Sequence, residues 1–412
     1  MSGAALAVLA AATLASAGAA RALTPNDPAW PLQWGPRVTR AADVWDRTTG
    51  DPRVVIAVVD TGVTPVADLR GALVPGWNFV DGNANTGDTA GHGTWAASII
   101  AARGNNDIDT AGYCWRCSVM PIRVSVGRAV STTNIAKGIV WAVDHGARII
   151  NISLDGAGSD PEEQAAVVYA SAHNVLVVAS AGNSGDTAPH YPAAYPSVLA
   201  VAGTDERNAL YSWSTRGDWV NIAAPGCATI VDANIGIASG CGSSFSPAAV
   251  SGIAGLLFSI DPSLTAARVS DALRSTAHAV AGIGGGTVDA LEATRALRLV
   301  DTTAATAAPT TSPTPRAAHG LQVSMINGLI AGTRVLSVRT GRGAVEIQLR
   351  SAATRSCELE LQVGRQVVVA TGGLRVVTLH ARTNSGPHRL TVACMPVKPT
   401  RFQLTIASPV AD

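Results

Sequence analysis

The chain has 412 residues, 14% of them charged, and a formal net charge of +1 at pH 7. A chain of this length can hold two or three domains and a large core. The near-neutral charge favours neither nucleic acid nor an anionic membrane surface as a partner. We expect a monomer that has no nucleic-acid partner.

The first 22 residues, MSGAALAVLAAATLASAGAARA, are small and apolar and end in Ala20-Arg21-Ala22. This A-x-A pattern is typical of a secretory signal peptide, so residues 1–22 are predicted to be removed from a secreted, extracellular protein. A short buried or membrane helix is the alternative, which the small residues and the cleavage pattern disfavour. No later segment has about 18 unbroken apolar residues, so no membrane span is expected in the mature chain.

Short apolar runs and helical stretches alternate through the next part of the chain. The apolar runs are at 53–60, 147–154, 174–182 and 197–203, and the helical patterns are at 132–146 and 161–174. Continuous apolar runs are typical of parallel strands that are covered on both sides. The pattern predicts an α/β fold with a mostly parallel sheet and helices on both faces, and with its site beyond the carboxyl ends of the strands.

The composition changes sharply near residue 300. Residues 301–316, DTTAATAAPTTSPTPR, lack large apolar side chains and predict a semi-extended linker. Residues 317–412 then contain stretches in which apolar and polar residues alternate, as in VEIQL at 345–349. This period predicts a small, C-terminal, all-β domain of the sandwich type.

Residue types that hydrolytic enzymes use in catalysis occur at the ends of the predicted strands and helices. Asp60 ends an apolar run, His92 opens a helix after glycine, and Asn183 lies in a glycine-flanked turn. Three serines, at 243, 244 and 246, precede an uncharged helix. Each motif alone is weak, because a helix cap or a turn residue would look the same. The chain order of acid, base, amide and serine is the more specific signal.

The motifs DTGV, GHGT, INISL, SAGNSG, YPAAYPSVLAV, AAPG and GSSF together resemble the subtilisin family of serine peptidases, in its thermitase-like branch. The resemblance covers roughly 23–298 and implies a subtilisin-like peptidase domain over 23–300. It implies a secreted serine endopeptidase that hydrolyses protein or peptide substrates through an acyl-enzyme. The alternative is an inactive homologue that binds its partner through the C-terminal β domain.

The resemblance also implies the catalytic roles. Asp60, His92 and Ser244 match the triad, and Asn183 matches the side chain that holds the oxyanion. Aligning the family pattern on its glycines selects Ser244 and leaves Pro247 one residue early. Aligning it on the proline would select Ser243 but would lose other matches, so Ser244 is the predicted nucleophile.

By the same resemblance, residues at two strand ends form the substrate pocket, with a histidine near its base. They are Ser153, Leu154, Asp155, Gly156, Ser180, Ala181, Gly182 and His190. Asp155 and His190 depart from the family pattern. Together they predict a preference for medium apolar residues before the cut, with a mild bias towards basic residues.

A structural Ca²⁺ ion is the cofactor that the resemblance implies, with no catalytic cofactor. The implied ligands are the side chains of Asp27, Asp68 and Asn106 and the carbonyls of Arg103, Ile108 and Thr110. Oxygen ligands from several segments suit Ca²⁺, although ordinary turn residues would give the same pattern. A second family site keeps only Asp81, because asparagines stand at 78 and 83, and we do not expect it to bind.

Six cysteines fall into three local groups, which in an exported chain predicts disulfides. The expected bridges are Cys114–Cys117, Cys227–Cys241 and Cys357–Cys394. The CWRC spacing at 114–117 also fits a redox motif or half of a zinc site. Because no second CxxC or pair of histidines accompanies it, a structural loop is preferred.

Overall fold

A computed structural model describes residues 23–127 and 129–299, together with the backbone of strands between 321 and 409. The predicted signal peptide and the predicted linker over 301–316 lie outside the described residues. In the described part of the chain, no helix is both long and apolar enough to cross a bilayer.

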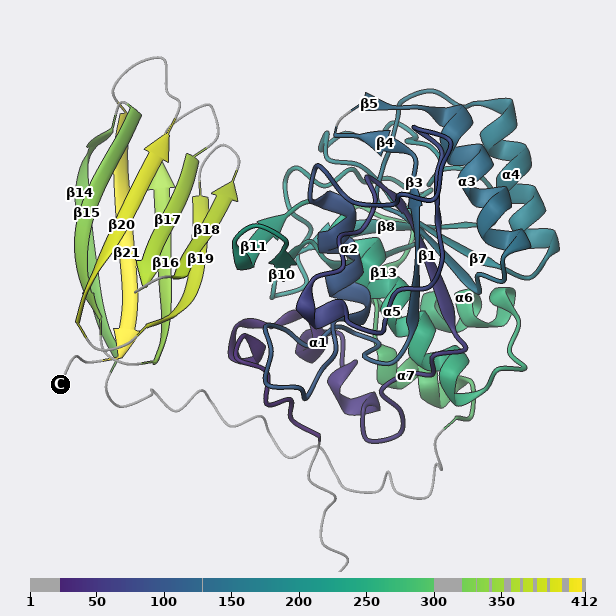
Figure 1. Cartoon of the computed structure of the whole chain (residues 1–412), viewed down its shortest axis with the longest axis horizontal. Coiled ribbons are helices and arrows are strands. Elements are labelled where there is room, and N and C mark those ends of the chain that lie inside the picture. Colours follow the sequence, from purple (N-terminus) through teal and green to yellow (C-terminus); the bar gives the residue numbers. More distant parts are fainter. Residues whose placement is uncertain are drawn as a thin grey trace, which may run out of the picture.

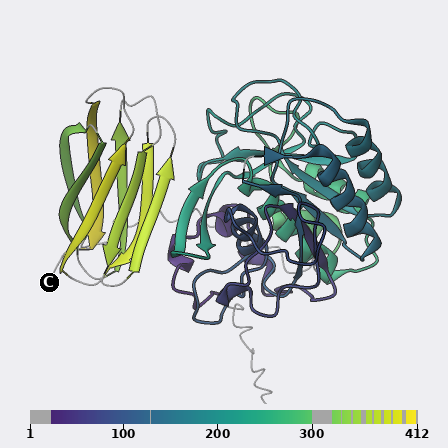
Figure 2. The ribbon, with the colours of Figure 1, turned by 45° about the horizontal axis from the view of Figure 1, so that its top comes forward.

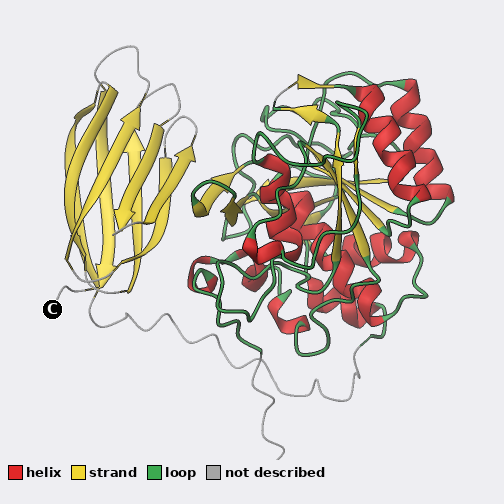
Figure 3. Ribbon diagram, viewed as in Figure 1, coloured by secondary structure: helices red, strands yellow, loops and turns green. Residues whose placement is uncertain are grey.

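A nine-stranded sheet forms the centre of the fold, in the order β12-β13-β9-β8-β7-β6-β1-β3-β2. Every neighbouring pair is parallel except β12 with β13, so the predicted α/β sheet is confirmed. Figure 3 shows the strands inside a shell of helices. The strands are β1 Val55–Asp60, β2 Trp77–Asn78, β3 Ser118–Arg123, β6 Ile149–Ile152, β7 Leu176–Ser180, β8 Val198–Thr204, β9 Ile222–Pro225, β12 His278–Ala279 and β13 Gly286–Thr287.

Successive residues of these strands enter two different cores. In β1, Ile56 and Val58 join one apolar cluster, whereas Ala57 and Val59 join the other. All four side chains are fully buried. This two-sided burial explains why the strands are continuous apolar runs, because alternating side chains point to opposite faces and both faces are covered.

Helices cover both faces of the sheet (Figure 1). Residues of α2 and α5 belong to one core and those of α3 and α4 to the other, and α3 and α4 run side by side (Figure 2). The longest of them, α5, is buried along nearly its whole length, in agreement with its uncharged sequence. The helices are α1 Gly35–Val38, α2 His92–Ala101, α3 Thr132–Asp144, α4 Pro161–Ala172, α5 Phe245–Ile260, α6 Ala266–Ser275 and α7 Ala290–Ala296, with 3₁₀ turns η1 Trp30–Leu32, η2 Ala42–Val44 and η3 Ala67–Leu69.

The four predicted strands and two predicted helices correspond to β1, β6, β7, β8, α3 and α4. Two buried strands, β3 and β9, were not predicted. β3 has the sequence SVMPIR and β9 the sequence IAAP, so proline interrupts or ends both apolar patterns. Proline cannot donate a backbone hydrogen bond, and a strand that contains it is hard to identify from the sequence.

Two of the three expected disulfides are formed. Cys114–Cys117 is fully buried, which argues against a redox or zinc role for this CxxC pair. Cys227–Cys241 joins directly opposed residues of the antiparallel strands β10 Cys227–Asp232 and β11 Gly236–Cys241. A second short hairpin joins β4 Ser125–Val126 to β5 Ala129–Val130. The Cys227–Cys241 bridge holds the segment that leads into Ser244.

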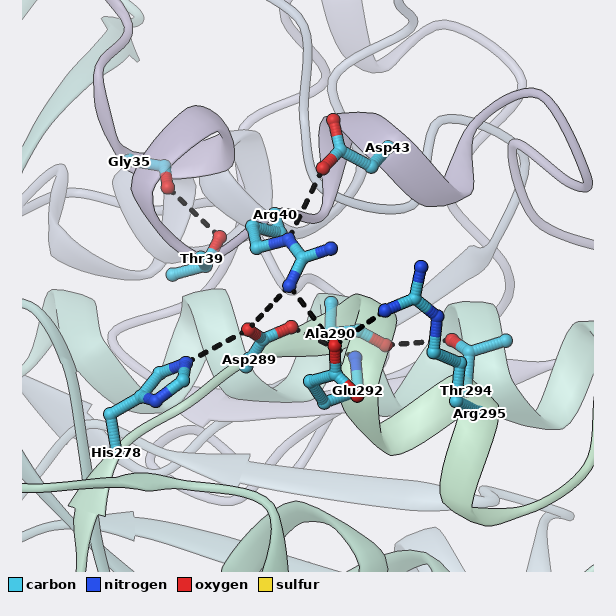
Figure 4. Close-up of polar contacts among 10 residues, drawn as sticks. All are labelled: Gly35, Thr39, Arg40, Asp43, His278, Asp289, Ala290, Glu292, Thr294 and Arg295. Atoms are coloured by element: carbon cyan, nitrogen blue, oxygen red, sulfur yellow. Dashed lines mark hydrogen bonds and ion pairs between the residues drawn. The ribbon is translucent and has the colours of Figure 1, made fainter. Parts of the chain in front are cut away.

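A cluster of charged residues joins the first and last parts of this region (Figure 4). The buried carboxylate of Asp289 pairs with Arg40 at 3.1 Å and with His278 at 3.0 Å. Asp289 also caps α7 by accepting a hydrogen bond from the Glu292 N–H, and Arg40 reaches Asp43 and Glu292 as well. We call Arg40, His278 and Asp289 the terminal clamp, because its partners are as far as 249 positions apart in the chain.

Strands also follow the predicted linker, and β17 pairs antiparallel with both β18 and β20. In the register of β17 and β20, Cys357 lies opposite Cys394, as the third expected disulfide requires, but side chains here lie outside the described part of the chain. That bridge and the separate β domain therefore remain predictions. The strands are β14 Leu321–Ile330, β15 Gly332–Thr340, β16 Gly343–Ser351, β17 Cys357–Val363, β18 Gln366–Gly372, β19 Val376–Thr383, β20 Gly386–Cys394 and β21 Thr400–Pro409.

Candidate active site

An aspartate and a histidine meet at the carboxyl edge of the sheet. Asp60 is the last residue of β1, and His92 is the first residue of α2. Nδ1 of His92 lies 2.8 Å from Oδ1 and 3.0 Å from Oδ2 of Asp60. Asp60 is fully buried, whereas 25% of the His92 side chain is exposed. With Nδ1 held by the carboxylate, Nε2 is the ring nitrogen that is left for a substrate-side partner.

Glycine lets the helix approach the strand so closely. A Cβ atom on Gly93 would lie 2.0 Å from the Gly62 carbonyl oxygen and 3.1 Å from Cβ of Asp60. Any larger residue at 93 would therefore push the start of α2 away from the end of β1. The glycines that flank His92 in the sequence thus have a direct role in bringing the imidazole to Asp60.

The charge state of His92 follows from its surroundings. Burial by itself lowers the pKa of the imidazole, but the charge and hydrogen bond of Asp60, together with the charge of Asp88, outweigh burial and raise the pKa. Phe245 stacks near the imidazole at 6.4 Å between ring centroids, and Trp95 lies edge-on at 6.1 Å. The imidazolium form is therefore stabilised in a partly apolar setting.

The three serines at the start of α5 have different surroundings, because Ser243 precedes the helix, Ser244 is its N-cap and Ser246 lies in its first turn. Ser243 is fully buried, and its Oγ hydrogen-bonds Oγ of Ser180 at 2.7 Å. Ser246 is also buried and donates to the carbonyls of Ala224 and Pro225. Ser244 is partly exposed at the N-cap of α5, next to the Phe245 ring that faces His92. Of the three, Ser244 alone is partly exposed, whereas Ser243 and Ser246 are buried.

Asn183 is tied to the same turn. Its Oδ1 accepts the backbone N–H of Ser243 at 2.8 Å, and the residue is exposed. Since Oδ1 is used in this bond, Nδ2 on the other arm of the amide is the atom that can donate to a ligand. An atom built as Cβ on Gly242 would lie 3.2 Å from Oγ of Ser244 and 3.8 Å from Oδ1 of Asn183, so these side chains lie on the same side of the turn.

The predicted pocket residues are brought beside this turn. Ser153, which follows β6, donates its Oγ hydrogen to the Ser244 carbonyl at 2.6 Å. Gly156 exchanges two backbone hydrogen bonds with Tyr191, at 2.9 and 2.8 Å. A Cβ on Gly182, the residue before Asn183, would lie 2.9 Å from Nδ1 of His190. The two strand ends and the segment that contains His190 therefore form one wall next to Ser244.

Asp155 and His190, the two residues that depart from the family pattern, contact each other. Nδ1 of His190 lies 2.8 Å from Oδ2 of Asp155, and Nε2 lies 3.1 Å from Oγ of Ser184 and 3.4 Å from Oδ1 of Asp186. His190 is buried. The predicted mild bias towards basic substrate residues depends on the charge of Asp155, and His190 already pairs with that carboxylate.

The model of the subtilase family matches residues 51–307, which is more than half of the chain. The chain belongs to the subtilase family. It is a subtilisin-like serine endopeptidase by family and by its relatives.

Thermitase from Thermoactinomyces vulgaris is 40% identical over 267 residues, which are 63% of this chain and 94% of that protein. The halolysin-like extracellular serine protease Nep from Natrialba magadii is 36% identical over 264 residues, which are 61% of this chain and 49% of that protein. Among solved structures, a protease from Pseudoalteromonas arctica aligns with a TM-score of 0.61 and 28% identity, over 66% of this chain and 99% of that one.

A second group of sequence-predicted residues, those expected to bind Ca²⁺, also meets in this subtilase. Asn106 donates its backbone N–H to Asp27 at 3.3 Å and its Nδ2 hydrogen to Asp68 at 2.9 Å. Thr110 donates its N–H to Asp68 at 3.0 Å. Both carboxylates are buried, and burial raises the pKa of Asp27 and raises that of Asp68 to about 7. The charge of Arg103 acts on Asp68, but in the described residues no ion pair within 4.0 Å involves either acid, and two such buried acids suit a bound cation.

The second family calcium site has other contacts in this subtilase. Asp81 accepts a hydrogen bond from Nδ2 of Asn78 at 2.9 Å and lies 3.8 Å from Arg123. Asn78 also accepts two backbone N–H groups and folds the loop as a turn. That no ion binds at this second site remains a prediction.

Sequence reasoning missed the residues that hold the site from behind. Asn151 donates to Oγ of Ser153 at 3.0 Å and accepts from Ser251 of α5 at 3.1 Å, so β6 and α5 are joined behind Ser244. Asp88 binds groups on both sides of the Asp60–His92 pair. An acid four residues before His92 is the one local signal that could have indicated this role.

Proposed function

We propose that this subtilase is a secreted endopeptidase in which Asp60, His92 and Ser244 form the triad and proceed through an acyl-enzyme. The supporting observation is the buried Asp60 carboxylate at 2.8 Å from Nδ1 of His92. It directs Nε2 towards the substrate side and stabilises the cation that forms when His92 accepts a proton. Ser244 is the accessible serine at the start of α5, and Phe245 next to it packs near the imidazole.

The proposed chemistry moves one proton back and forth. His92 accepts the Ser244 hydroxyl proton as Oγ attacks the peptide carbonyl, and then gives that proton to the leaving amine. The acyl-enzyme is hydrolysed by water in the same way, with His92 again as the base. His92 must be neutral to accept this proton, so activity is expected to fall on the acid side, and its raised pKa places that fall at higher pH than for an unperturbed histidine.

Two donors would hold the oxyanion. They are Nδ2 of Asn183, whose Oδ1 is fixed by the Ser243 N–H, and the backbone N–H of Ser244 at the start of α5. A helix N-terminus favours negative charge, which adds to the effect of both donors. Loss of one such donor typically costs about 10²–10³ in turnover.

The substrate would lie along Ser153–Gly156 and Ser180–Gly182, with His190 at the base of the pocket for the residue before the cut. The hydrogen bonds of Gly156 to Tyr191 and the packing of His190 on Gly182 support this arrangement. Because Asp155 is partnered by His190, its attraction for a basic substrate residue is weak. The volume of the pocket therefore determines which residue before the cut is preferred, and medium apolar residues are preferred over Phe and Tyr.

A structural Ca²⁺ ion is also part of the proposal. The side chains of Asp27, Asp68 and Asn106 would hold it, with carbonyls of Arg103, Ile108 and Thr110. The ion would supply positive charge to two buried carboxylates, which Asp107 and Asp109 make still more unfavourable. In the described residues no three Asp, Glu, His or Cys side chains converge, so amide and carbonyl oxygens would have to complete the site. Asn106 now turns Nδ2 towards Asp68, and ligation would require its Oδ1 there instead.

The strands after residue 320 are proposed to form an accessory β domain, held by Cys357–Cys394. The alternating sequence and the opposed register of the two cysteines support it. Extracellular location is proposed from the signal-like residues 1–22 and from the names of relatives. An inactive scaffold whose function lies in this β domain is the alternative, and the intact set of Asp60, His92, Ser244 and Asn183 argues against it.

A fluorophosphonate probe and a peptide substrate test the proposed function. The wild type should be labelled and should hydrolyse peptides, and Ser244→Ala should lose both activities. Ser243→Ala should keep a substantial fraction, because that hydroxyl is buried against Ser180. Labelling that maps to Ser243 would place the nucleophile there, and an unlabelled wild type would favour the inactive scaffold.

A further inference from the structure

Asp88 has an unusually complete set of hydrogen bonds for a partly exposed loop residue. Its Oδ1 accepts from Oγ1 of Thr61 at 2.9 Å and from the N–H groups of Ala90 and Gly91 at 2.9 and 2.8 Å. Its Oδ2 accepts from the N–H and Oγ1 of Thr94, at 2.9 and 2.8 Å. One carboxylate therefore binds five donors on two separate segments.

These donors flank the catalytic pair on both sides. Thr61 follows Asp60 directly and donates its own N–H to Oδ1 of Asp60 at 2.7 Å. Gly91 precedes His92, and Thr94 lies two residues after it. Thr61 also accepts the N–H of Gly93 at 3.0 Å, so the end of β1 and the start of α2 are joined directly and through Asp88.

Asp88 also replaces the missing cap of α2. The N-cap residue is Gly91, at φ 88°, and it has no side chain that could accept the free N–H groups of the first turn. The carboxylate of Asp88 accepts the Thr94 N–H from outside the helix and places negative charge at its N-terminus, where both effects stabilise the first turn. His92 is in that turn, so the cap fixes the backbone that carries the imidazole.

We propose that Asp88 is a positioning residue of the catalytic site, which holds the strand end of Asp60 and the helix start of His92 as one hydrogen-bonded unit and adds a second negative charge near the imidazole. The proposal rests on the proposed triad. Asp88 does not touch the substrate or Ser244 in this scheme, and it acts through Thr61, Gly91 and Thr94.

The charge of Asp88 gives a measurable signature. Burial lowers the pKa of His92, while Asp60 and, more weakly, Asp88 raise it. The other side chains shown beside the ring are Trp95 and Phe245, which do not titrate. Removing the charge of Asp88 should therefore lower the pKa of His92 and move the acid limb of activity to lower pH.

Asp88→Asn removes the charge and keeps the size of the side chain. One carboxylate oxygen is then replaced by an NH₂ group, which cannot accept hydrogen bonds from the N–H and O–H groups around it. Some of the five hydrogen bonds are therefore lost. We expect kcat to fall by about 10- to 100-fold, as small misplacements of catalytic groups do, with KM little changed. Asp261→Asn is the matched control, because Asp261 accepts two hydrogen bonds from Ser263 at the far end of α5 and should leave both constants unchanged.

Thr61→Val is the second variant, in case the first one folds poorly. It keeps the bonds of Asp88 to Thr94 but removes the hydroxyl that joins the end of β1 to Asp88 and to the Gly93 N–H, while the Thr61 N–H can still reach Asp60. It should lower kcat as well, and the double variant should lose less than the product of the two single losses, because both changes break one unit. An unchanged kcat in folded Thr61→Val, or independent losses, would overturn the positioning role.

NMR titration of the His92 ring in a Ser244→Ala background separates this proposal from the proposed function. In that background, Asp88→Asn should titrate at lower pH than the parent. If the titration of His92 is the same in Asp88→Asn and in the parent, Asp88 is only a helix cap and the proposal is overturned. The same conclusion follows if the loss of kcat is fully explained by a loss of folding stability. An inactive wild type would instead refute the proposed function and leave the titration interpretable.

Discussion

At the scale of single residues, the pocket depends on how His190 is held. Asp155, Ser184 and Asp186 all lie within hydrogen-bonding or ion-pairing distance of its ring. The imidazole is therefore fixed by several contacts, and it packs on the backbone of Gly182. If His190 lies at the base of the proposed pocket, its fixed ring takes up volume there, and the size of the substrate side chain should matter more for specificity than the charge of Asp155.

His190→Gly should enlarge the pocket. Cleavage after Phe and Tyr should rise relative to Leu and Val, by about 10-fold or more, since a methylene-sized change of a pocket is worth about 1–3 kcal/mol. Profiling on a peptide library would measure it. Asp155→Asn is the control, because it changes charge and keeps volume. An unchanged profile in His190→Gly would show that His190 lies outside the pocket.

At the scale of secondary-structure elements, the terminal clamp joins α7 to the segment between α1 and η2. Asp289 is 1% exposed and combines an ion pair with Arg40, a hydrogen bond with His278 and the cap of α7 (Figure 4). Removing this carboxylate takes one ion-pair partner from Arg40 and leaves α7 without its cap. The carboxylate therefore stabilises the contact between these elements much more than an exposed ion pair would.

Asp289→Ala should lower the free energy of unfolding by about 2–4 kcal/mol, between the loss of a cap and the loss of a buried ion pair. Asp43→Ala is the control, because Asp43 also pairs with Arg40 but its carboxylate is half exposed. It should lower the free energy of unfolding by about 0–1 kcal/mol. Denaturant unfolding in a Ser244→Ala background avoids self-digestion. Equal losses in both variants would contradict the role of the terminal clamp.

At the scale of the whole molecule, the proposed calcium site joins three parts of the chain that are distant in sequence. Asp27 precedes η1, Asp68 lies in η3, and Asn106 follows α2. The site therefore links the N-terminal segment to the body of the peptidase region. If an ion binds there, it should stabilise the fold as a unit.

Calcium at about 100 times its dissociation constant should add roughly 2.7 kcal/mol of stability, which a chelator should remove. In a Ser244→Ala background, the melting temperature should fall by several degrees in chelator. Asp68→Asn should melt at the same temperature with and without Ca²⁺, while Asp81→Asn should respond as the parent does. A parent that is insensitive to the chelator would remove calcium from the proposal.

Short-range patterns in the chain were sufficient for much of this description. Runs such as RVVIAVVD reveal a strand that is buried on both faces, because that burial leaves no polar position in the run. The order of Asp60, His92, Asn183 and Ser244 indicated the family, since each residue follows or opens a recognisable element. Strands that contain proline, such as β3, were missed because their pattern is interrupted.

The partners of individual side chains depended on the folded chain. Asp155 looked like a free charge until folding placed His190, 35 positions later, against it. The sequence pattern indicated no role for Asp88 or Asp289, whose partners come from β1 and α2 in the first case and from Arg40, 249 positions earlier, in the second. Buried or half-buried charges take whichever partners the fold brings within about 3 Å. Local sequence constrains the element in which a residue lies, whereas such distant contacts arise only when the elements pack.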